Sequence, residues 1–263
     1  MLTIADLSVK SRDGKQLLSN VSLRLDKGEC VGLTGASGAG KTTLIRTIMG
    51  TSGKQLLISS GDIQADGKSI LEASYKERRA MCGRYFGFIP QNSMTSFFSN
   101  VKIGKQIIET YRLNLSMTAA EAHELAAEML RLVNLSDTDR VMSSYPGQLS
   151  GGMLQRVAMS IVLGIKPTYL LADEPTSALD RDNRALLTEL LSGYKDGGIL
   201  FISHDAEAIV SLCSSVCVME HGRIVESKET GLLFRAPQHP WTKAFVNAAE
   251  RSRRENAEWK QLR

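Results

Sequence analysis

The chain has 263 residues, and 43% of them are hydrophobic, so it is long and apolar enough to bury the core of one large domain or two small ones. Its 32 basic and 28 acidic side chains leave a net charge of only +4, which disfavours intrinsic disorder and gives no support to a nucleic-acid-binding protein. The N-terminus lacks the basic and apolar regions of a signal peptide, and no apolar run approaches the length of a membrane span, so we expect a soluble cytoplasmic chain.

In chain order, hydrophobic periodicity predicts an antiparallel pair of strands followed by alternating helices and strands. The opening strands are joined by a turn at Asp13-Gly14, and residues 50–60 are expected to be mostly loop, with strand character at 56–58. Strands are expected at residues 2–9, 17–25, 30–34, 85–89, 168–172 and 199–203, with a final pair around His221-Gly222, and helices at 44–49, 122–133 and 181–191. Helices that alternate with buried strands indicate a parallel sheet with crossover connections.

The segment from about residue 91 to 147 is expected to be a helical insertion in this α/β domain. Thr118 and Glu121 form a capping box, and apolar residues then recur at spacings of three and four up to Val133. This pattern predicts an amphipathic helix.

The four cysteines are Cys30, Cys82, Cys213 and Cys217, and they lack the paired spacing of zinc ligands. Cys30 lies in a predicted strand that should be buried. We therefore interpret the thiols as small core side chains of a protein in a reducing compartment.

A glycine-rich run lies between a predicted strand and a predicted helix. It comprises Gly35, Ala36, Ser37, Gly38, Ala39, Gly40, Lys41, Thr42 and Thr43. Glycines let backbone N–H groups come close enough to form an anion-binding concavity at a helix N-terminus. Lys41 can then reach the outer phosphates of a nucleotide, and the Thr42 hydroxyl can bind Mg²⁺. The run predicts bound ATP or GTP; a turn that merely joins strand to helix is the alternative, and the flanks disfavour it.

Two adjacent carboxylates, Asp173 and Glu174, follow the apolar strand expected at 168–172. Asp173 is placed to hold Mg²⁺ through water, and Glu174 can accept a proton from an attacking water. The pair could instead belong to a solvated turn, but the apolar residues directly before it favour the catalytic interpretation.

Six short motifs in this order and spacing, from about residue 2 to 226, resemble those of the ATP-binding subunits of ATP-binding cassette (ABC) transporters. They are the phosphate loop, Pro90-Gln91, Leu149-Ser150-Gly151-Gly152-Met153-Leu154-Gln155-Arg156, the strand ending in Asp173-Glu174, Ser177-Ala178-Leu179-Asp180 and Ser203-His204-Asp205. The resemblance implies an α/β P-loop NTPase fold of the ABC ATPase type, with an antiparallel β subdomain, a parallel-sheet core and an inserted α-helical subdomain. It also implies a domain at 1–250 with the helical subdomain at about 91–150, and a basic C-terminal tail at 251–263.

The resemblance further implies ATP rather than GTP, bound with Mg²⁺ between two subunits arranged head to tail. Ser150, Gly151 and Gly152 would bind the γ-phosphate of the nucleotide held by the opposite subunit, so one subunit alone has an incomplete site. Asp180 would contact the partner subunit.

Two more residues receive catalytic roles from the resemblance. Gln91 would sense Mg²⁺ and the attacking water. Because it begins the helical insertion, its movement could be transmitted to a membrane partner. His204 would contact the γ-phosphate and help to orient the water and Glu174.

The sequence departs from the family pattern at two positions. Arg12 stands where an aromatic residue usually stacks on adenine, and its planar guanidinium can also stack. Met153 stands where glutamine is usual, a variant that resembles the oligopeptide, nickel and metallophore importers, as does the tail segment 233–244.

The resemblance implies an ATPase subunit of an importer, peripheral on the cytoplasmic face of the membrane. Its partners would be a second ATPase subunit, two transmembrane permease subunits and, indirectly, an extracytoplasmic solute-binding protein, with no nucleic acid. The alternative is a soluble ABC-type ATPase module of a non-transport complex, while a DNA-repair ATPase is disfavoured because the insertion is too short for long coiled coils. The cargo, the identity of the partner ATPase and the adenine-stacking residue stay open.

Overall fold

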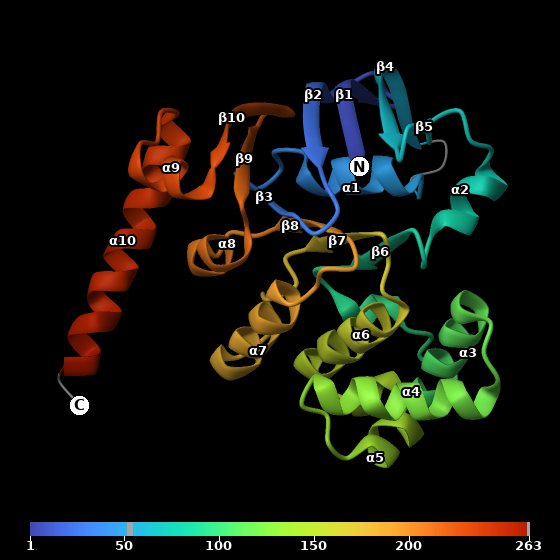
Figure 1. The fold of residues 1–263 in the computed structure, drawn as a ribbon. Helices are drawn as coiled ribbons and strands as arrows, with labels where there is room; N and C mark the ends of the chain where they lie inside the picture. Colours follow the sequence, from blue (N-terminus) through green and yellow to red (C-terminus); the bar gives the residue numbers. More distant parts are fainter. Residues whose placement is uncertain (52–54, 262–263) are drawn as a thin grey trace. The chain divides into compact units, whose positions relative to one another are not determined.

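The computed structural model describes residues 1–51 and 55–261, in which strands and helices alternate along the chain (Figure 1). These residues form two compact units, each built from separated stretches of sequence. The first unit contains Met1–Leu25, Glu29–Glu72 and Leu200–Arg263, and the second contains Asp26–Gly28 and Ala73–Ile199. The middle of the chain is thus an insertion in the sequence of the first unit.

An antiparallel sheet in the first unit has the strand order β2-β1-β4-β5. Its strands are β1 (Leu2–Ser11), β2 (Gln16–Leu25), β4 (Leu56–Ala65) and β5 (Lys68–Ser69). Val21, Leu23 and Leu25 of β2 are buried and alternate with exposed residues, as the period of two predicts. The predicted turn between β1 and β2 is confirmed, with Gly14 at φ 87°.

β4 is a ten-residue strand in a stretch that the sequence predicted to be mostly loop up to residue 60. It pairs with β1 over its whole length. Gly61 has φ 85°, and a Cβ there would lie 2.5 Å from the carbonyl oxygen of Ala5, so this approach requires glycine. Periodicity failed to predict most of β4 because backbone pairing, rather than alternation of its own side chains, holds the strand.

The part of the second sheet that belongs to the first unit has the strand order β10-β9-β3-β8. It contains β3 (Cys30–Gly35), β9 (Ser215–Glu220), β10 (Arg223–Glu229) and the end of β8 (Gly198–Ile202), whose first residues belong to the second unit. β3 and β9 are parallel, whereas β9 and β10 form an antiparallel hairpin. The predicted crossover architecture is therefore confirmed, since parallel strands so far apart in sequence need a crossover connection.

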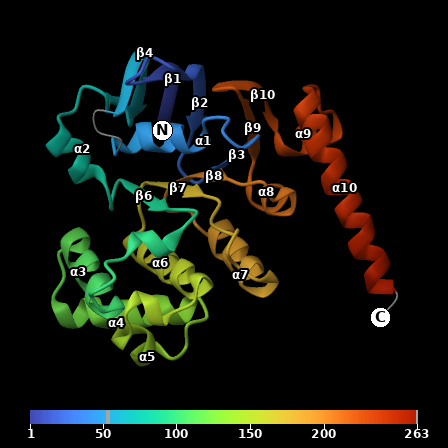
Figure 2. The ribbon, with the colours of Figure 1, turned by 180° about the vertical axis from the view of Figure 1, so that it is seen from behind.

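The helices of the first unit are α1 (Lys41–Met49), α8 (Ala206–Leu212), α9 (Thr230–Arg235) and α10 (Pro240–Gln261). α10 begins at Pro240, a residue type that suits the first position of a helix, and runs out from the region of α9 (Figure 2). It continues past residue 250, where the sequence predicted the start of a basic tail, and residues 262–263 of that tail lie outside the described residues.

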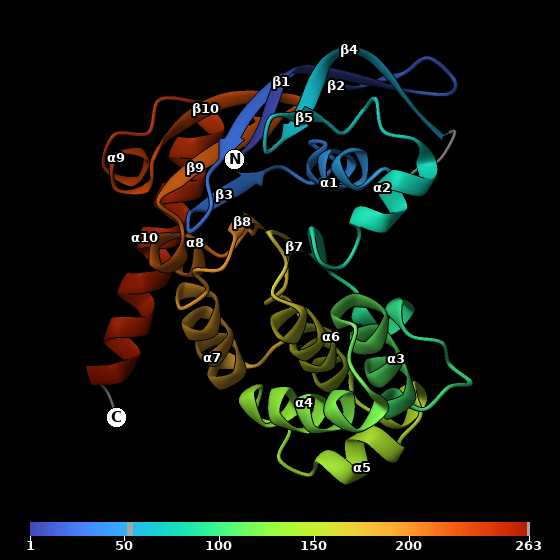
Figure 3. The same cartoon turned by 45° about the vertical axis from the view of Figure 1, so that its right-hand side comes forward.

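In the second unit, the short strands β6 (Phe86–Ile89) and β7 (Tyr169–Asp173) pair in parallel. Helices α3 to α6 gather below them in Figure 3. The helices and 3-10 turns are α2 (Tyr75–Met81), η2 (Ser93–Ser96), α3 (Ile103–Leu115), α4 (Ala119–Leu132), α5 (Thr138–Ser143), η3 (Pro146–Gln148), α6 (Gly151–Ile165) and α7 (Arg181–Ser192). The capping box predicted at Thr118 and Glu121 is confirmed at the start of α4.

A buried tyrosine joins two helices of the second unit. Tyr111 of α3 is fully buried and donates its hydroxyl to the carbonyl oxygen of Ser160 in α6 at 2.7 Å. Gly164 leaves room for that ring, because a Cβ there would overlap the hydroxyl.

The helix α2 was not predicted from the sequence, although Ser74 and Glu77 form a second capping box that could have revealed it.

Within residues 1–51 and 55–261, none of the helices is both long enough and apolar enough to span a bilayer.

Candidate active site

Residues 35–43 join β3 to α1, which is the strand, loop and helix context predicted for a phosphate-binding loop. Gly35 has φ 145°, and a Cβ there would overlap the carbonyl oxygen of Met219. Gly40, at φ 107°, is the N-cap of α1, and Gly38, at φ 76°, would place a Cβ in open space. Glycine is thus needed for backbone conformation at three points and for space at the start of the loop.

Lys41 is the first residue of α1, and its side chain folds back over the loop. Its Nζ donates to the carbonyl oxygens of Gly35 at 2.7 Å and Ala36 at 3.0 Å. The loop is also tied to the β9–β10 turn, since the N–H of Gly222 donates to the carbonyl oxygen of Ala39 at 2.9 Å. The ammonium therefore lies at the loop whose ligand it is expected to bind.

The other loop residues surround this lysine in sequence and differ in exposure. Ser37 is exposed, whereas Ala36, Thr42 and Thr43 are half-buried. Thr42 lies in the first turn of α1. The backbone N–H groups of a first turn have no acceptor within their own helix.

His204 also belongs to the first unit and lies two residues beyond the end of β8, after Ser203. The N–H of Ser203 donates to the carbonyl oxygen of Leu33 at 3.3 Å, which brings this loop next to β3, the strand that leads into the phosphate loop. His204 is exposed, while Asp205 accepts hydrogen bonds from two backbone N–H groups as the N-cap of α8. Arg12 is exposed in the turn between β1 and β2.

The second unit carries the predicted carboxylates at the carboxyl end of β7. Asp173 is the last residue of that strand and is buried. Glu174 follows in the left-handed region, with φ 47°, and its carbonyl oxygen accepts hydrogen bonds from the N–H and the hydroxyl of Ser177. A non-glycine residue in this region is strained, and here the next turn holds it in place.

Gln91 meets Glu174 directly in the structure. Gln91 follows β6, the strand beside β7, and its Nε2 donates to Glu174 Oε2 at 3.0 Å. Sequence motifs 83 residues apart are thereby joined at one edge of the parallel pair. This bond fixes the orientation of the Glu174 carboxylate, which can still accept further hydrogen bonds. A fixed orientation suits a group that is expected to orient water.

Ser150, Gly151 and Gly152 lie at the start of α6. Ser150 is the N-cap and accepts the N–H of Met153 at 3.3 Å. A Cβ on Gly152 would lie 3.2 Å from the carbonyl oxygen of Ala178, in the turn that follows Glu174. The helix start is therefore packed closely against that turn.

Asp180 is exposed and is the N-cap of α7. Its carboxylate accepts the N–H of Asn183 at 2.9 Å and the Asn183 side-chain amide at 2.8 Å, and these bonds lower the pKa of the carboxyl. Asp180 thus has a structural role in its own chain beside the contact with a partner that the sequence suggested.

The predicted site residues fall into two groups, one in each unit. Residues 35–43, Arg12 and His204 belong to the first, and Gln91, 150–152, Asp173, Glu174 and Asp180 belong to the second.

Gln155 lies in the motif at residues 149–156, but nothing in the sequence by itself assigns it a role. The side chain is 1% exposed and contacts the loops on both sides of the Gln91 and Glu174 pair. A polar residue among the apolar positions of a helix is the signal that could have revealed it.

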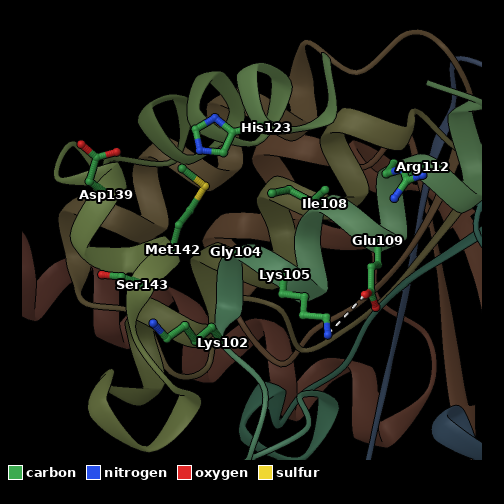
Figure 4. Close-up of a pocket in the computed structure, with 10 residues that line it drawn as sticks. All are labelled: Lys102, Gly104, Lys105, Ile108, Glu109, Arg112, His123, Asp139, Met142 and Ser143. Atoms are coloured by element: carbon green, nitrogen blue, oxygen red, sulfur yellow. Dashed lines mark ion pairs between the residues drawn. The ribbon is translucent and has the colours of Figure 1, made fainter. Parts of the chain in front are cut away.

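A separate pocket of about 500 Å³ lies on the helical part of the second unit (Figure 4). Ile108 and Met142 supply apolar surface, while Lys102, Arg112 and His123 bring polar groups to its margin. Lys105 pairs with Glu109 at 3.9 Å. None of the motif residues lines this pocket.

Comparison with known proteins identifies the family. Residues 18–177 match the ABC transporter family. The chain is 36% identical to a probable peptide ABC transporter ATP-binding protein of Sinorhizobium fredii, over 90% of this chain and 72% of that protein. It is 32% identical to the metal-staphylopine import system ATP-binding protein of Staphylococcus aureus, over 95% of this chain and 94% of that protein.

Solved structures give the same fold. A dimeric post-hydrolysis state of the ATP-binding cassette MJ0796, bound to ADP and Pi, superposes with a TM-score of 0.78 at 23% identity, covering 88% of this chain and 99% of that one. An ATP-binding subunit of an ABC transporter superposes with a TM-score of 0.75 at 25% identity, covering 89% and 92%. The chain therefore belongs to the ABC transporter family, as an ATP-hydrolysing subunit with the P-loop NTPase fold.

Proposed function

We propose that this chain is the motor subunit of an importer for peptides, nickel or metal chelates, and that it couples ATP binding and hydrolysis to transport. The relatives named for peptide and metal-staphylopine import support the cargo class. The observation that carries the catalytic part is the 3.0 Å hydrogen bond between Gln91 and Glu174 at the end of a buried strand. In this proposal residues 1–250 form the ATPase domain, with a helical subdomain at about 91–150 and a basic tail at 251–263.

The proposed nucleotide is ATP, held by the loop at residues 35–43. Lys41 would exchange its two carbonyl partners for the outer phosphates, and Arg12 would stack on adenine. The hydroxyl of Thr42, the amide oxygen of Gln91 and the carboxylate of Asp173 are the hard oxygen donors that Mg²⁺ prefers. Bound there, the ion would neutralise charge on the β- and γ-phosphates.

Hydrolysis would depend on Glu174 accepting a proton from the attacking water. Gln91 orients that carboxylate, and His204 would contact the γ-phosphate. Ser150, Gly151 and Gly152 would donate to the γ-phosphate bound by a second ATPase subunit, identical or related, while Asp180 contacts that subunit. ATP binding would then close the pair of subunits, and hydrolysis would reopen it.

The proposed membrane partners are two permease subunits, with an extracytoplasmic solute-binding protein acting through them. Phe98 is 73% exposed, and Phe97 beside it is half-buried. Gln106 holds the turn that carries them, accepting the N–H of Phe98 at 2.9 Å and donating to Val101 at 2.7 Å. We propose that this turn, which follows Gln91 in the chain, contacts a short helix of a permease at the cytoplasmic face of the membrane.

Replacing the general base tests the catalytic proposal. Glu174→Gln should bind ATP normally and lose about 100-fold or more of the hydrolysis rate, because the amide cannot accept the proton. Steady-state ATPase and equilibrium binding of labelled ATP measure the two properties. Glu189→Gln removes an exposed charge from the same unit and is the control. Rapid hydrolysis by Glu174→Gln would refute the assigned role.

Replacing the loop lysine tests the placement of the nucleotide. Lys41→Ala should lose ATP affinity, since it removes the cation expected to reach the outer phosphates. Unchanged binding of labelled ATP would contradict this placement.

A soluble ATPase module of a non-transport complex is the second candidate. Purification from membranes with two polytopic subunits bound would support the importer. Recovery wholly in the soluble fraction would favour the alternative.

A further inference from the structure

Gln155 is a buried residue of the second unit whose side-chain amide is hydrogen-bonded through both its nitrogen and its oxygen. It lies in α6, and its side chain is 1% exposed. Its Nε2 donates to the carbonyl oxygens of Pro90 at 3.2 Å and Pro175 at 3.1 Å, and its Oε1 accepts the hydroxyl of Ser93 at 2.5 Å. A buried amide is tolerated when all its groups are bonded, and this one is bonded in three directions.

The two carbonyl partners lie on either side of the proposed catalytic pair. Pro90 directly precedes Gln91, and Pro175 directly follows Glu174. Both prolines lie beyond the ends of β6 and β7, where the strand ladder no longer fixes the backbone. One amide group therefore links the two loops that bring Gln91 and Glu174 to hydrogen-bonding distance.

Ser93 determines which way the Gln155 amide points. Its hydroxyl is a donor to Oε1 and its side chain is 3% exposed, so the oxygen faces Ser93 and both amide hydrogens face the proline carbonyls. A flipped amide would place its oxygen against two carbonyl oxygens, which is unfavourable.

The position of Gln155 on α6 adds a second consequence. Gly151 lies four residues earlier, so the two lie on the same face of the helix. The same helix thus begins with the residues expected to bind the opposite nucleotide and holds the loops of its own catalytic pair.

We propose that Gln155 is a positioning residue for ATP hydrolysis, which sets the geometry of Gln91 and Glu174 through the backbones of Pro90 and Pro175. The inference rests on the proposed catalytic roles of that pair. Gln155 itself does not touch the nucleotide. Its loss lowers turnover because a small misplacement of reacting groups is costly in rate.

Gln155→Met tests this in the full-length chain, purified with the subunits that bind to it. The variant keeps the volume of the side chain and removes all three hydrogen bonds. We expect kcat to fall about 10- to 100-fold while the dissociation constant for labelled ATP changes less than about threefold, because the phosphate loop is unaltered. Ser160→Ala is the matched control, since it removes a buried hydroxyl of α6 that donates to the carbonyl oxygen of Val157 in the same helix, at 2.8 Å.

A double-mutant cycle separates positioning from general loss of structure. Because Gln155 is proposed to hold Gln91 and Glu174 at hydrogen-bonding distance, the Gln91→Ala background has no such pair left to position, and Gln155→Met should lower kcat less there than in the wild type. Equal fractional losses in the two backgrounds, or a folded Gln155→Met variant with wild-type kcat, would overturn the inference.

Ser93→Ala is the milder variant if Gln155→Met does not fold. It removes only the bond that orients the amide, so kcat should fall about threefold with ATP binding unchanged. Wild-type kcat in this variant would also count against the inference. If Glu174→Gln hydrolyses ATP normally, the proposed function fails instead; if only the Gln155 and Ser93 variants are normal, the positioning role fails alone.

Discussion

At the scale of single residues, both the proposed general base and the first residue of the phosphate loop have positive φ angles. Glu174 has φ 47° at the end of β7, and Gly35 has φ 145° at the end of β3. Glu174 keeps a side chain in the left-handed region because Ser177 caps its carbonyl oxygen twice. A side chain at Gly35 is not tolerated, because the backbone of β9 occupies the space that it would need.

Gly35→Ala should therefore destabilise the protein strongly. Its Cβ would overlap the carbonyl oxygen of Met219, and the backbone angle adds strain, for a loss of about 3 kcal/mol or more in the free energy of unfolding. Gly38→Ala is the matched control, because its Cβ meets open space and only the positive φ costs about 1 kcal/mol. Urea denaturation compares the two; similar losses would show that the overlap at Gly35 is relieved at no cost.

At the scale of elements, a buried carboxylate fastens the start of α10 to β10. The side chain of Glu226 is 4% exposed and pairs with Lys228 Nζ at 2.8 Å. It also accepts the N–H groups of Gln238 and His239, each at 2.9 Å. Burial by itself would raise the pKa of Glu226, but the bonds from Lys228 and the two N–H groups lower it to about 2.

This anchor predicts a defined pH dependence of stability. Because the pKa of Glu226 is lower in the folded than in the unfolded chain, its contribution is complete above about pH 4.5 and is lost as the pH falls toward 2. Glu226→Gln should cost about 2–3 kcal/mol at pH 7 and progressively less below pH 4.5. Thermal unfolding from pH 7 to 3 measures this difference.

Glu250→Gln, an exposed substitution on α10, is the control for Glu226→Gln. A stability difference for Glu226→Gln that stays constant over the whole pH range would contradict the lowered pKa.

At the scale of the whole molecule, the start of α6 is the part of the site proposed to serve a second subunit. Ser150 is exposed, and a Cβ on Gly151 would meet only the Sδ of Met94, at 4.0 Å. A substitution at Gly151 therefore fits its own chain. Its effect would fall on whatever binds to the helix start.

Glu174→Gln should form an ATP-dependent dimer, because it binds ATP without hydrolysing it. Adding Gly151→Asp should abolish that dimer while leaving ATP binding by each chain intact, since a carboxylate at the helix start repels the γ-phosphate of the opposite nucleotide. Size-exclusion chromatography with light scattering, with and without ATP, measures the association.

The control for Gly151→Asp is Gly147→Asp, which adds the same charge four residues earlier, where a Cβ also meets open space. An ATP-dependent dimer that survives Gly151→Asp, or one that Gly147→Asp removes equally, would contradict the head-to-tail arrangement.

Local chemistry by itself determined much of this protein. The spacing of glycines, Lys41 and Thr42 predicted the phosphate loop, the capping box at Thr118 predicted the start of α4, and alternation predicted β2. Each of these signals is contained within a few neighbouring residues, so it can be recognised without knowing the fold.

Contacts between distant segments were decided only by the tertiary structure. β4 exists because β1 pairs with it. Cys30 and Cys213, which look unrelated in the sequence, bring their sulfur atoms to 3.6 Å, with Cys30 half-buried rather than buried. Gln155 became interpretable only when folding placed Pro90 and Pro175 around its amide. A sequence states which hydrogen-bonding groups are present, whereas the direction and distance of their partners depend on how the strands and helices pack.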